Sequence, residues 1–167
     1  MKNKKSLSEV ISTVLLVLVA VVAVVIIIGF VVPFVNEQLS KGDCIKVAGE
    51  IRLVNSPQYT CYNSSNHVML VQVHLGDILD KIKGFSIILG GASSKAIEIT
   101  NNTHVTGVTM YGAAGNLLIP GKNEEITYRI ESVDVKPDSV GLSPILNNGH
   151  SCDISDISPT VVNCFVG

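Results

Sequence analysis

The residues of this chain best suited to covalent chemistry are its four cysteines, Cys44, Cys61, Cys152 and Cys164. None belongs to a C-x-x-C motif and no H-x-H pair accompanies them, so their spacing does not favour a zinc site. In an oxidising compartment four cysteines form two disulfides. Three pairings are open, of which the nearest-neighbour one joins Cys44 to Cys61 and Cys152 to Cys164. We expect two disulfides and no bound metal.

Two short motifs predict a second covalent modification. The tripeptides that begin at Asn63 and Asn101 match the acceptor pattern for N-linked glycosylation, Asn-x-Ser/Thr. Both lie in turn-like stretches, where an acceptor side chain is accessible. We therefore expect a glycan at each of these asparagines.

Residues that could carry out catalysis are not grouped in the sequence. The chain contains no G-x-S-x-G, P-loop, H-E-x-x-H or Rossmann motif. Its four histidines are dispersed, and its net charge of −2 gives no footprint for nucleic acid. We expect no catalytic residues, no cofactor and no nucleic-acid partner, and we do not expect an enzyme.

The longest apolar segment of the chain is an uncharged run over residues 10–35, rich in Val, Ile and Leu. As a helix this run is roughly 39 Å long at 1.5 Å per residue, more than the roughly 30 Å of a bilayer's hydrocarbon core. It is apolar on all sides, which is not the pattern of an amphipathic helix on a soluble domain. We expect a membrane-spanning helix.

The ends of this helix carry recognisable signals. Ser8 is a candidate N-cap, and Glu9 in the first turn is favoured by the helix dipole. Gly29 and Pro33 predict a kink or a melted turn near the far end. The helix is expected to stop at residues 40–42, which mark the boundary with the remainder of the chain.

Residues 42–167, called the head below, have the texture of a β domain. Short runs of β-branched residues alternate with clusters of Gly, Asn, Pro and Ser. The predicted fold class is α+β, with a long N-terminal hydrophobic helix and an all-β antiparallel head, a sandwich or small barrel that is Ig-like in the broad sense. Residues 77–83 are ambiguous and could form a helical turn. The expected strands cover residues 44–54, 67–75, 84–89, 96–100, 117–119, 124–131, 140–146 and 160–165.

The N-terminus is the most specific signal in the sequence. Three lysines within the first five residues precede Ser6, and the apolar run follows almost directly. A secretory signal peptide carries its small-residue cleavage site after the hydrophobic segment, whereas here the small residue precedes it. The basic end is expected to stay on the cytoplasmic side, with the head outside.

This arrangement resembles the archaeal type IV prepilins and archaellin-like proteins, which carry class III signal peptides. The likeness rests on the basic residues, Ser6 and the stretch LSEVI over residues 7–11, and it extends over residues 4–34. The family often has Gly or Ala where this chain has Ser6, and many members have Pro where it has Glu9. Residues 84–89, Pro120-Gly121 ahead of Tyr128, and residues 148–153 resemble segments of archaeal pilin heads.

The resemblance implies cleavage between Ser6 and Leu7 by a membrane-embedded prepilin peptidase. The chain would then comprise a leader (residues 1–6), a hydrophobic helix (7–41) and an extracytoplasmic head (42–167). Ser8, Glu9, Gly29 and Pro33 are the residues assigned to helix registration and assembly. The implied partners are identical subunits in a helical homopolymer, the peptidase, an assembly ATPase with its membrane platform protein, and the membrane before assembly.

These features predict a structural subunit of a surface filament for adhesion or motility, found at the cell surface and single-pass in the membrane before assembly. Two alternatives stay open: a monomeric, membrane-anchored binding module, and a minor pilin that primes or caps a filament. For Glu9, one reading is that it neutralises the new α-amino group of a neighbouring subunit. The other is that it interacts only with its own helix dipole.

Overall fold

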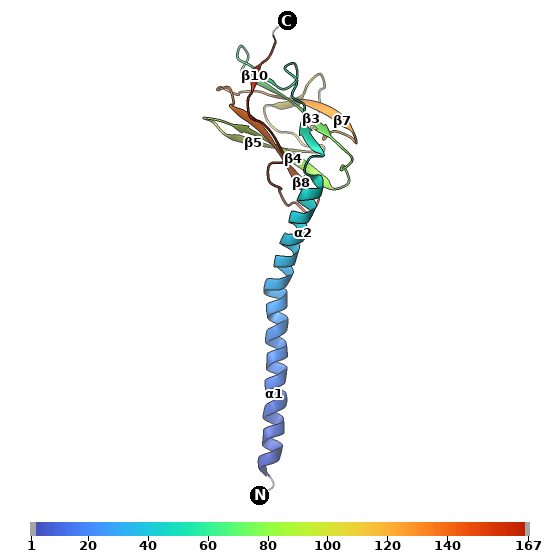
Figure 1. Cartoon of the computed structure of the whole chain (residues 1–167), viewed down its shortest axis with the longest axis vertical. Coiled ribbons are helices and arrows are strands. Elements are labelled where there is room, and N and C mark those ends of the chain that lie inside the picture. Colours follow the sequence, from blue (N-terminus) through green and yellow to red (C-terminus); the bar gives the residue numbers. More distant parts are fainter. Residues whose placement is uncertain (1–2, 166–167) are drawn as a thin grey trace. The chain divides into compact units, whose positions relative to one another are not determined.

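A computed structural model describes the backbone of residues 3–165 and the side chains of residues 11–165. The chain divides into two compact units, Met1–Lys41 and Gly42–Gly167. A long apolar N-terminal helix is followed by a mostly antiparallel β region with two sheets, which confirms the predicted α+β class (Figure 1).

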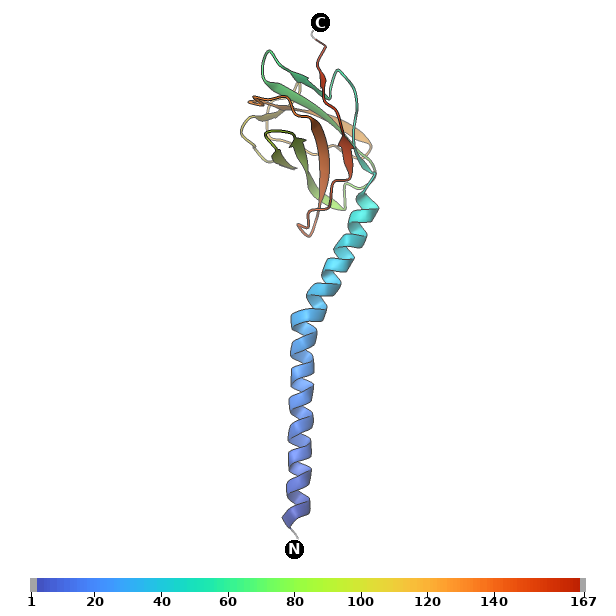
Figure 2. The same ribbon diagram turned by 60° about the vertical axis from the view of Figure 1, so that its left-hand side comes forward.

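The helical segment is continuous but changes its hydrogen-bond pattern in the middle. α1 (Asn3–Ile26) leads into the π-helical turn η1 (Ile27–Val31) and then into α2 (Val32–Val47). Pro33 has no N–H to donate to the carbonyl of Gly29, and its ring would crowd that carbonyl in a regular α-helix. The preceding Val32 N–H bonds the carbonyl of Ile27, five residues back. The interruption predicted at Gly29 and Pro33 is therefore a π-helical turn, near which the ribbon bends (Figure 2).

Both predicted helix ends were wrong. The helix begins at Asn3, so Ser8 lies inside it and is not an N-cap. Lys, Leu and Glu are good helix formers, which lets the helix include residues 3–8. At the other end α2 runs to Val47, and residues 44–47, expected as strand, are helical. Cys44 and Val47 are three residues apart on one helix face; Val47 is buried and Cys44 is disulfide-bonded, so tertiary contacts override β propensity.

The head contains two sheets. In the first, the strand order is β10-β2-β3-β7-β6, with β1 also paired to β3; in the second it is β5-β4-β8-β9. All these pairs are antiparallel except β10 with β2. The strands are β1 (Ile51–Leu53), β2 (Cys61–Asn63), β3 (Val68–Leu75), β4 (Ile82–Gly90), β5 (Lys95–Thr100), β6 (Val108–Met110), β7 (Glu124–Ile130), β8 (Ser139–Leu146), β9 (Asp156–Ser158) and β10 (Val162–Asn163).

The core of the head lies between the two sheets. Alternate residues of β3, including Val71 and Val73, are fully buried, as the period of two in the sequence predicts. Phe85 of β4 meets Tyr128 of β7 edge to face, with 5.7 Å between ring centroids, so the largest buried side chains join the two sheets. The Tyr128 hydroxyl donates a hydrogen bond of 2.6 Å to the carbonyl of Leu118.

Some strand predictions need correction. Residues 117–119 form no strand; Leu117 makes one isolated bridge, and the Ile119 N–H donates to the side chain of Asn101 instead of to a neighbouring strand. Residues 160–165 contain only the two-residue β10. Of residues 77–83, residues 79–81 form a turn and residues 82–83 already belong to β4. The three-residue strands β2, β6 and β9 were not predicted, because three residues are too few to establish a period of two.

Candidate functional site: the exposed apolar helix

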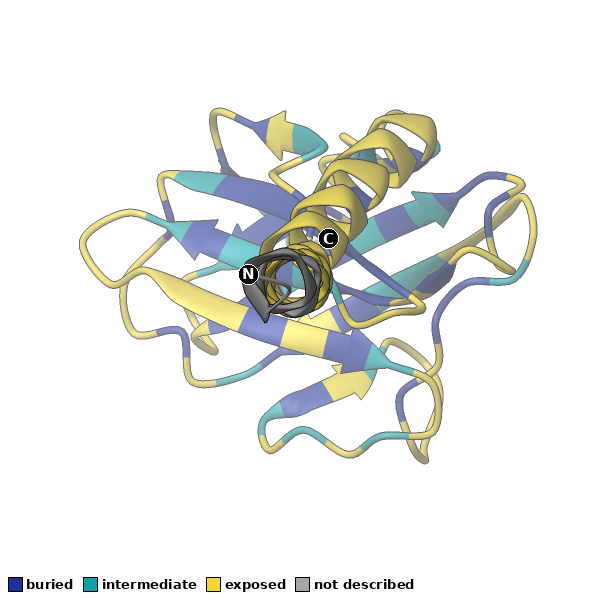
Figure 3. Cartoon of the chain, turned by 90° about the horizontal axis from the view of Figure 1, so that it is seen from below, coloured by how far each residue is buried: buried dark blue, intermediate teal, exposed yellow. Residues whose placement is uncertain are grey.

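The most unusual surface of this protein is the apolar helix itself. Every side chain over residues 11–35 is exposed, with Leu16 at 70% and Phe30 at 72% of full exposure. Residues 11–39 of the helix are all exposed, and most of the described helix is coloured as exposed in Figure 3, whereas the strands of the head carry both buried and exposed stretches. Soluble monomers rarely expose continuous apolar surface of this extent, so the helix requires an apolar environment that the chain does not supply.

Within the described residues, one helix has the length and apolarity to cross a bilayer. It covers Ile11–Val47 and reaches a mean hydropathy of 3.6. A membrane anchor and a signal sequence both have these properties. An apolar helix surface of this kind can associate with lipid or with other apolar helices.

Small residues give this helix places where another helix can come close. Ala20, Ala23 and Gly29 are all exposed, and a Cβ added at Gly29 would meet no atom within 4 Å other than its chain neighbours and the backbone of its own helix. From residue 10 onward the first charged residue is Glu37, which pairs with Lys41 one turn later at 2.9 Å. The uncharged surface therefore includes small residues that allow another helix to approach closely, as in tightly packed membrane helices.

The residues assigned to processing lie at the very start of the helix. The backbone of Ser6, Leu7, Ser8 and Glu9 is helical, as part of α1. Their side chains, and Lys2, lie outside the described part of the structure. The assignments of cleavage to Ser6 and Leu7, and of registration to Ser8 and Glu9, therefore stay predictions.

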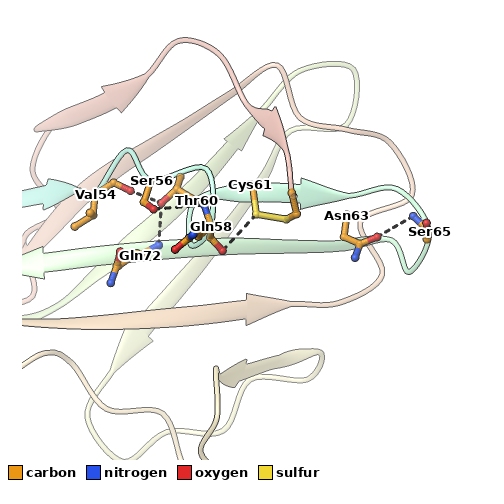
Figure 4. Close-up of a disulfide and its surroundings, with 9 residues drawn as sticks. Val54, Ser56, Gln58, Thr60, Cys61, Asn63, Ser65 and Gln72 are labelled. Carbon is orange, nitrogen blue, oxygen red and sulfur yellow. Dashed lines mark hydrogen bonds between the residues drawn. A yellow bond between two sulfur atoms is a disulfide. The ribbon is translucent and has the colours of Figure 1, made fainter. Parts of the chain in front are cut away.

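The four cysteines form two disulfides, Cys44–Cys152 and Cys61–Cys164. The nearest-neighbour pairing is not the one adopted, and no described cysteine is free. Cys44 lies near the C-terminal end of α2 and Cys152 in the loop after β8. Cys61 begins β2, and Cys164 directly follows β10, the strand that pairs with β2 (Figure 4). The second disulfide thus fixes the C-terminal strand to the edge of the first sheet.

The two predicted glycosylation sites differ in their surroundings. Asn63 ends β2, is half-buried, and its Oδ1 accepts a hydrogen bond from the Ser65 backbone N–H at 2.9 Å (Figure 4). Asn101 is exposed in a turn, and its Oδ1 accepts from the Ile119 N–H at 2.8 Å. Asn63 lies close to Cys164, which is disulfide-bonded to Cys61 two residues before Asn63. The sequence did not indicate that Cys164 lies near Asn63.

Histidines and acids are not gathered into a metal centre anywhere in the described part of the chain, where no group of three or more His, Cys, Asp or Glu side chains is placed to hold an ion. His74 instead faces Glu125 at 3.5 Å across β3 and β7, and His67 Nδ1 lies 3.4 Å from the Tyr62 hydroxyl.

Sequence reasoning missed one cluster on the head. Tyr59 and Tyr111, on separate loops, meet edge to face with 6.5 Å between ring centroids. A signal for this cluster was absent because its members are far apart in the sequence.

Comparisons of the chain with protein-family models, with curated proteins and with solved structures found no match.

Proposed function

We propose that this protein is a structural subunit of a type IV pilus-like surface filament, processed at its N-terminus and polymerised through its apolar helix. The observation that carries the proposal is the helix over residues 11–35, which is exposed at every position and precedes a disulfide-bonded β head. Before assembly the bilayer covers this helix. After assembly the helices of neighbouring subunits replace the lipid, which is the exchange that drives helix association in membranes.

Removal of the leader supports assembly for an electrostatic reason. The leader contains Lys2, Lys4 and Lys5, and without these lysines the formal charge changes from 12 − 14 = −2 to 9 − 14 = −5. Unpaired ammonium groups inside a bundle of apolar helices would be strongly destabilising. Cleavage before Leu7 removes all three and leaves one new α-amino group, which the carboxylate of Glu9 can neutralise.

The head is suited to the outer surface of such a filament. Its two disulfides each close more than 100 residues, 108 for Cys44–Cys152 and 103 for Cys61–Cys164, and stabilise a folded domain outside the reducing cytosol. A head-to-tail contact repeated by a rotation that does not close generates an open helical polymer. Identical helices that pack around a common axis meet this condition.

The test is the composition of filaments sheared from cells. We expect this chain to be abundant in the sheared, lipid-free fraction. Its presence only in membranes would instead support the monomeric, anchored binding module, and trace stoichiometry in filaments made of another protein would support a minor pilin.

A further inference from the structure

A groove of about 740 Å³ lies on the outer face of the first sheet. This volume is in the range of sites that hold small organic ligands, roughly 300–1,000 Å³. Its floor crosses adjacent strands: Leu70 of β3 lies opposite Arg129 of β7, which lies opposite Thr109 of β6. Asn63 of β2 lines the same groove, beside the Cys61–Cys164 disulfide. The groove therefore lies entirely within the head.

The exposed aromatic side chains of the head gather at this groove. Tyr111 and Phe165 line it, at 57% and 80% exposure, and Tyr59 contacts Tyr111 from the loop that also supplies the lining residue Gln58. The other aromatic residues among the described residues of the head, Tyr62, Phe85 and Tyr128, are buried. Exposed aromatic rings on one sheet face call for a covering partner with an apolar side.

The polar lining specifies the chemistry of that partner. Gln58, Asn66 and Arg129 add planar amide and guanidinium groups to the rings. These groups donate in fixed directions to hydroxyl and carbonyl oxygens, and the amides also accept. A saccharide has this combination of properties, because each sugar ring has a face of C–H groups that packs on an aromatic ring and an edge of hydroxyls. The groove is thus complementary to an oligosaccharide.

The acceptor for a glycan is part of the groove. Asn63 Oδ1 is held by the Ser65 N–H in an Asx turn, which leaves Nδ2 without a hydrogen bond to any described residue. Attachment joins Nδ2 to the anomeric carbon of a lipid-linked oligosaccharide phosphate. The anomeric C–O bond breaks, the phosphate leaves with the electron pair, and the amide loses one proton. The first sugar then begins at the wall of the groove.

We propose that the glycan linked to Asn63 binds in this groove and covers Tyr59, Tyr111 and Phe165, so that the chain's own saccharide completes the outer face of the first sheet. Asn101 has no equivalent role, because it lies in an exposed turn outside this groove. The inference requires export of the head and does not rest on filament formation.

The four tyrosines of the chain provide the test. Two of them, Tyr59 and Tyr111, lie at the groove, and the other two are buried and serve as internal references. Full-length protein exported by its native cells is treated with tetranitromethane, and nitration of each tyrosine and glycan occupancy at Asn63 and Asn101 are read by peptide mass spectrometry. Ser65→Ala removes the hydroxyl that the Asn-x-Ser/Thr motif requires for glycosylation of Asn63, but keeps the backbone N–H that bonds Asn63. Asn101→Asp removes the other acceptor and keeps an oxygen for the Ile119 N–H.

We expect Asn63 to carry a glycan in the wild type, and nitration of Tyr59 and Tyr111 to rise about tenfold in Ser65→Ala, the change for a docking equilibrium of about ten to one. Asn101→Asp leaves both rates unchanged. Should Ser65→Ala expose the buried tyrosines, and so be unfolded, Asn63→Gln takes its place. An unmodified Asn63, equal nitration with and without its glycan, or an equal rise in Asn101→Asp overturns the proposal.

Discussion

Cys44, near the C-terminal end of α2, is disulfide-bonded to Cys152, 108 positions later, with 5.5 Å between their Cα atoms. The bond ties the last residues of the helix to the loop after β8. The backbone connection at residues 48–50 is thus supported by a second covalent connection. In the proposed filament, where neighbouring subunits would hold the helix, force on the head would be shared between the two connections.

Removal of either disulfide is expected to destabilise the head. The double variants Cys44→Ser/Cys152→Ser and Cys61→Ser/Cys164→Ser should each lose about 2–5 kcal/mol of unfolding free energy, and by similar amounts, because the two closed loops are nearly equal in length at 108 and 103 residues. Denaturant unfolding of detergent-solubilised protein measures the loss. If both double variants unfold at the wild-type midpoint, the disulfides have no stabilising role.

Tyr128 predicts a loss of stability at alkaline pH. Burial raises the pKa of this phenol above its ordinary value of about 10, because the charged form is poorly solvated in the core. Because the pKa of Tyr128 is higher in the folded than in the unfolded state, its contribution to the unfolding free energy is fully present below a pH of about 10. This contribution falls as the pH rises beyond that value. We expect the unfolding free energy of the wild type to decrease above pH of about 10.

Tyr128→Phe is the matched variant. It should lose about 0.5–1.5 kcal/mol at neutral pH, because the carbonyl of Leu118 is left without its donor. Its stability should then decrease less steeply than that of the wild type above pH of about 10. Parallel pH profiles for the two proteins would show that Tyr128 is not the group responsible.

A substitution at Gly29 distinguishes the effect of helix packing from that of membrane insertion. A Cβ added there meets no atom within 4 Å other than its chain neighbours and the backbone of its own helix, and leucine is favourable in lipid. In a tightly packed bundle the added volume costs about 1–3 kcal/mol per subunit. We expect Gly29→Leu to insert normally but to yield about tenfold fewer filaments. Ile28→Leu, which conserves volume, is the control, and wild-type filament numbers in Gly29→Leu would exclude close packing at this position.

Glu9→Gln tests registration by charge. In this variant the α-amino group of Leu7, exposed by removal of the leader, would lie unpaired in an apolar bundle. An unpaired buried charge costs about 3–5 kcal/mol. Fewer filaments are therefore expected from Glu9→Gln, whereas Glu9→Asp retains the carboxylate and should assemble. Counts by electron microscopy decide, and normal numbers in Glu9→Gln would leave only the interaction of Glu9 with its own helix dipole.

The sequence was most informative where local pattern and tertiary environment agree. The uncharged run over residues 10–35 can form only a helix, and the alternation through Val71 and Val73 requires one buried strand face. Prediction from the sequence failed where a contact with a residue distant in the sequence determines the local secondary structure. Ile119 does not extend a strand because Asn101 takes its N–H. Residues 44–47 stay helical because Cys44 bonds Cys152.

The groove at Asn63 illustrates the same limit for the candidate sites. Asn63 was identified by its tripeptide, but Tyr59, Tyr111 and Phe165 are separated by dozens of residues and share no periodicity. Only the strand order β10-β2-β3-β7-β6 brings their segments to one side of the first sheet. The disulfide pairing likewise depends on strand order, because β10 pairs with β2 and so places Cys164 beside Cys61.

Peptide mass spectrometry of filaments sheared from cells tests in one measurement whether the leader is removed and whether the apolar helix polymerises. We expect abundant filament material whose N-terminal peptide begins at Leu7. An intact leader, found only in the membrane fraction, would rule out a filament subunit and make this protein an anchored surface module.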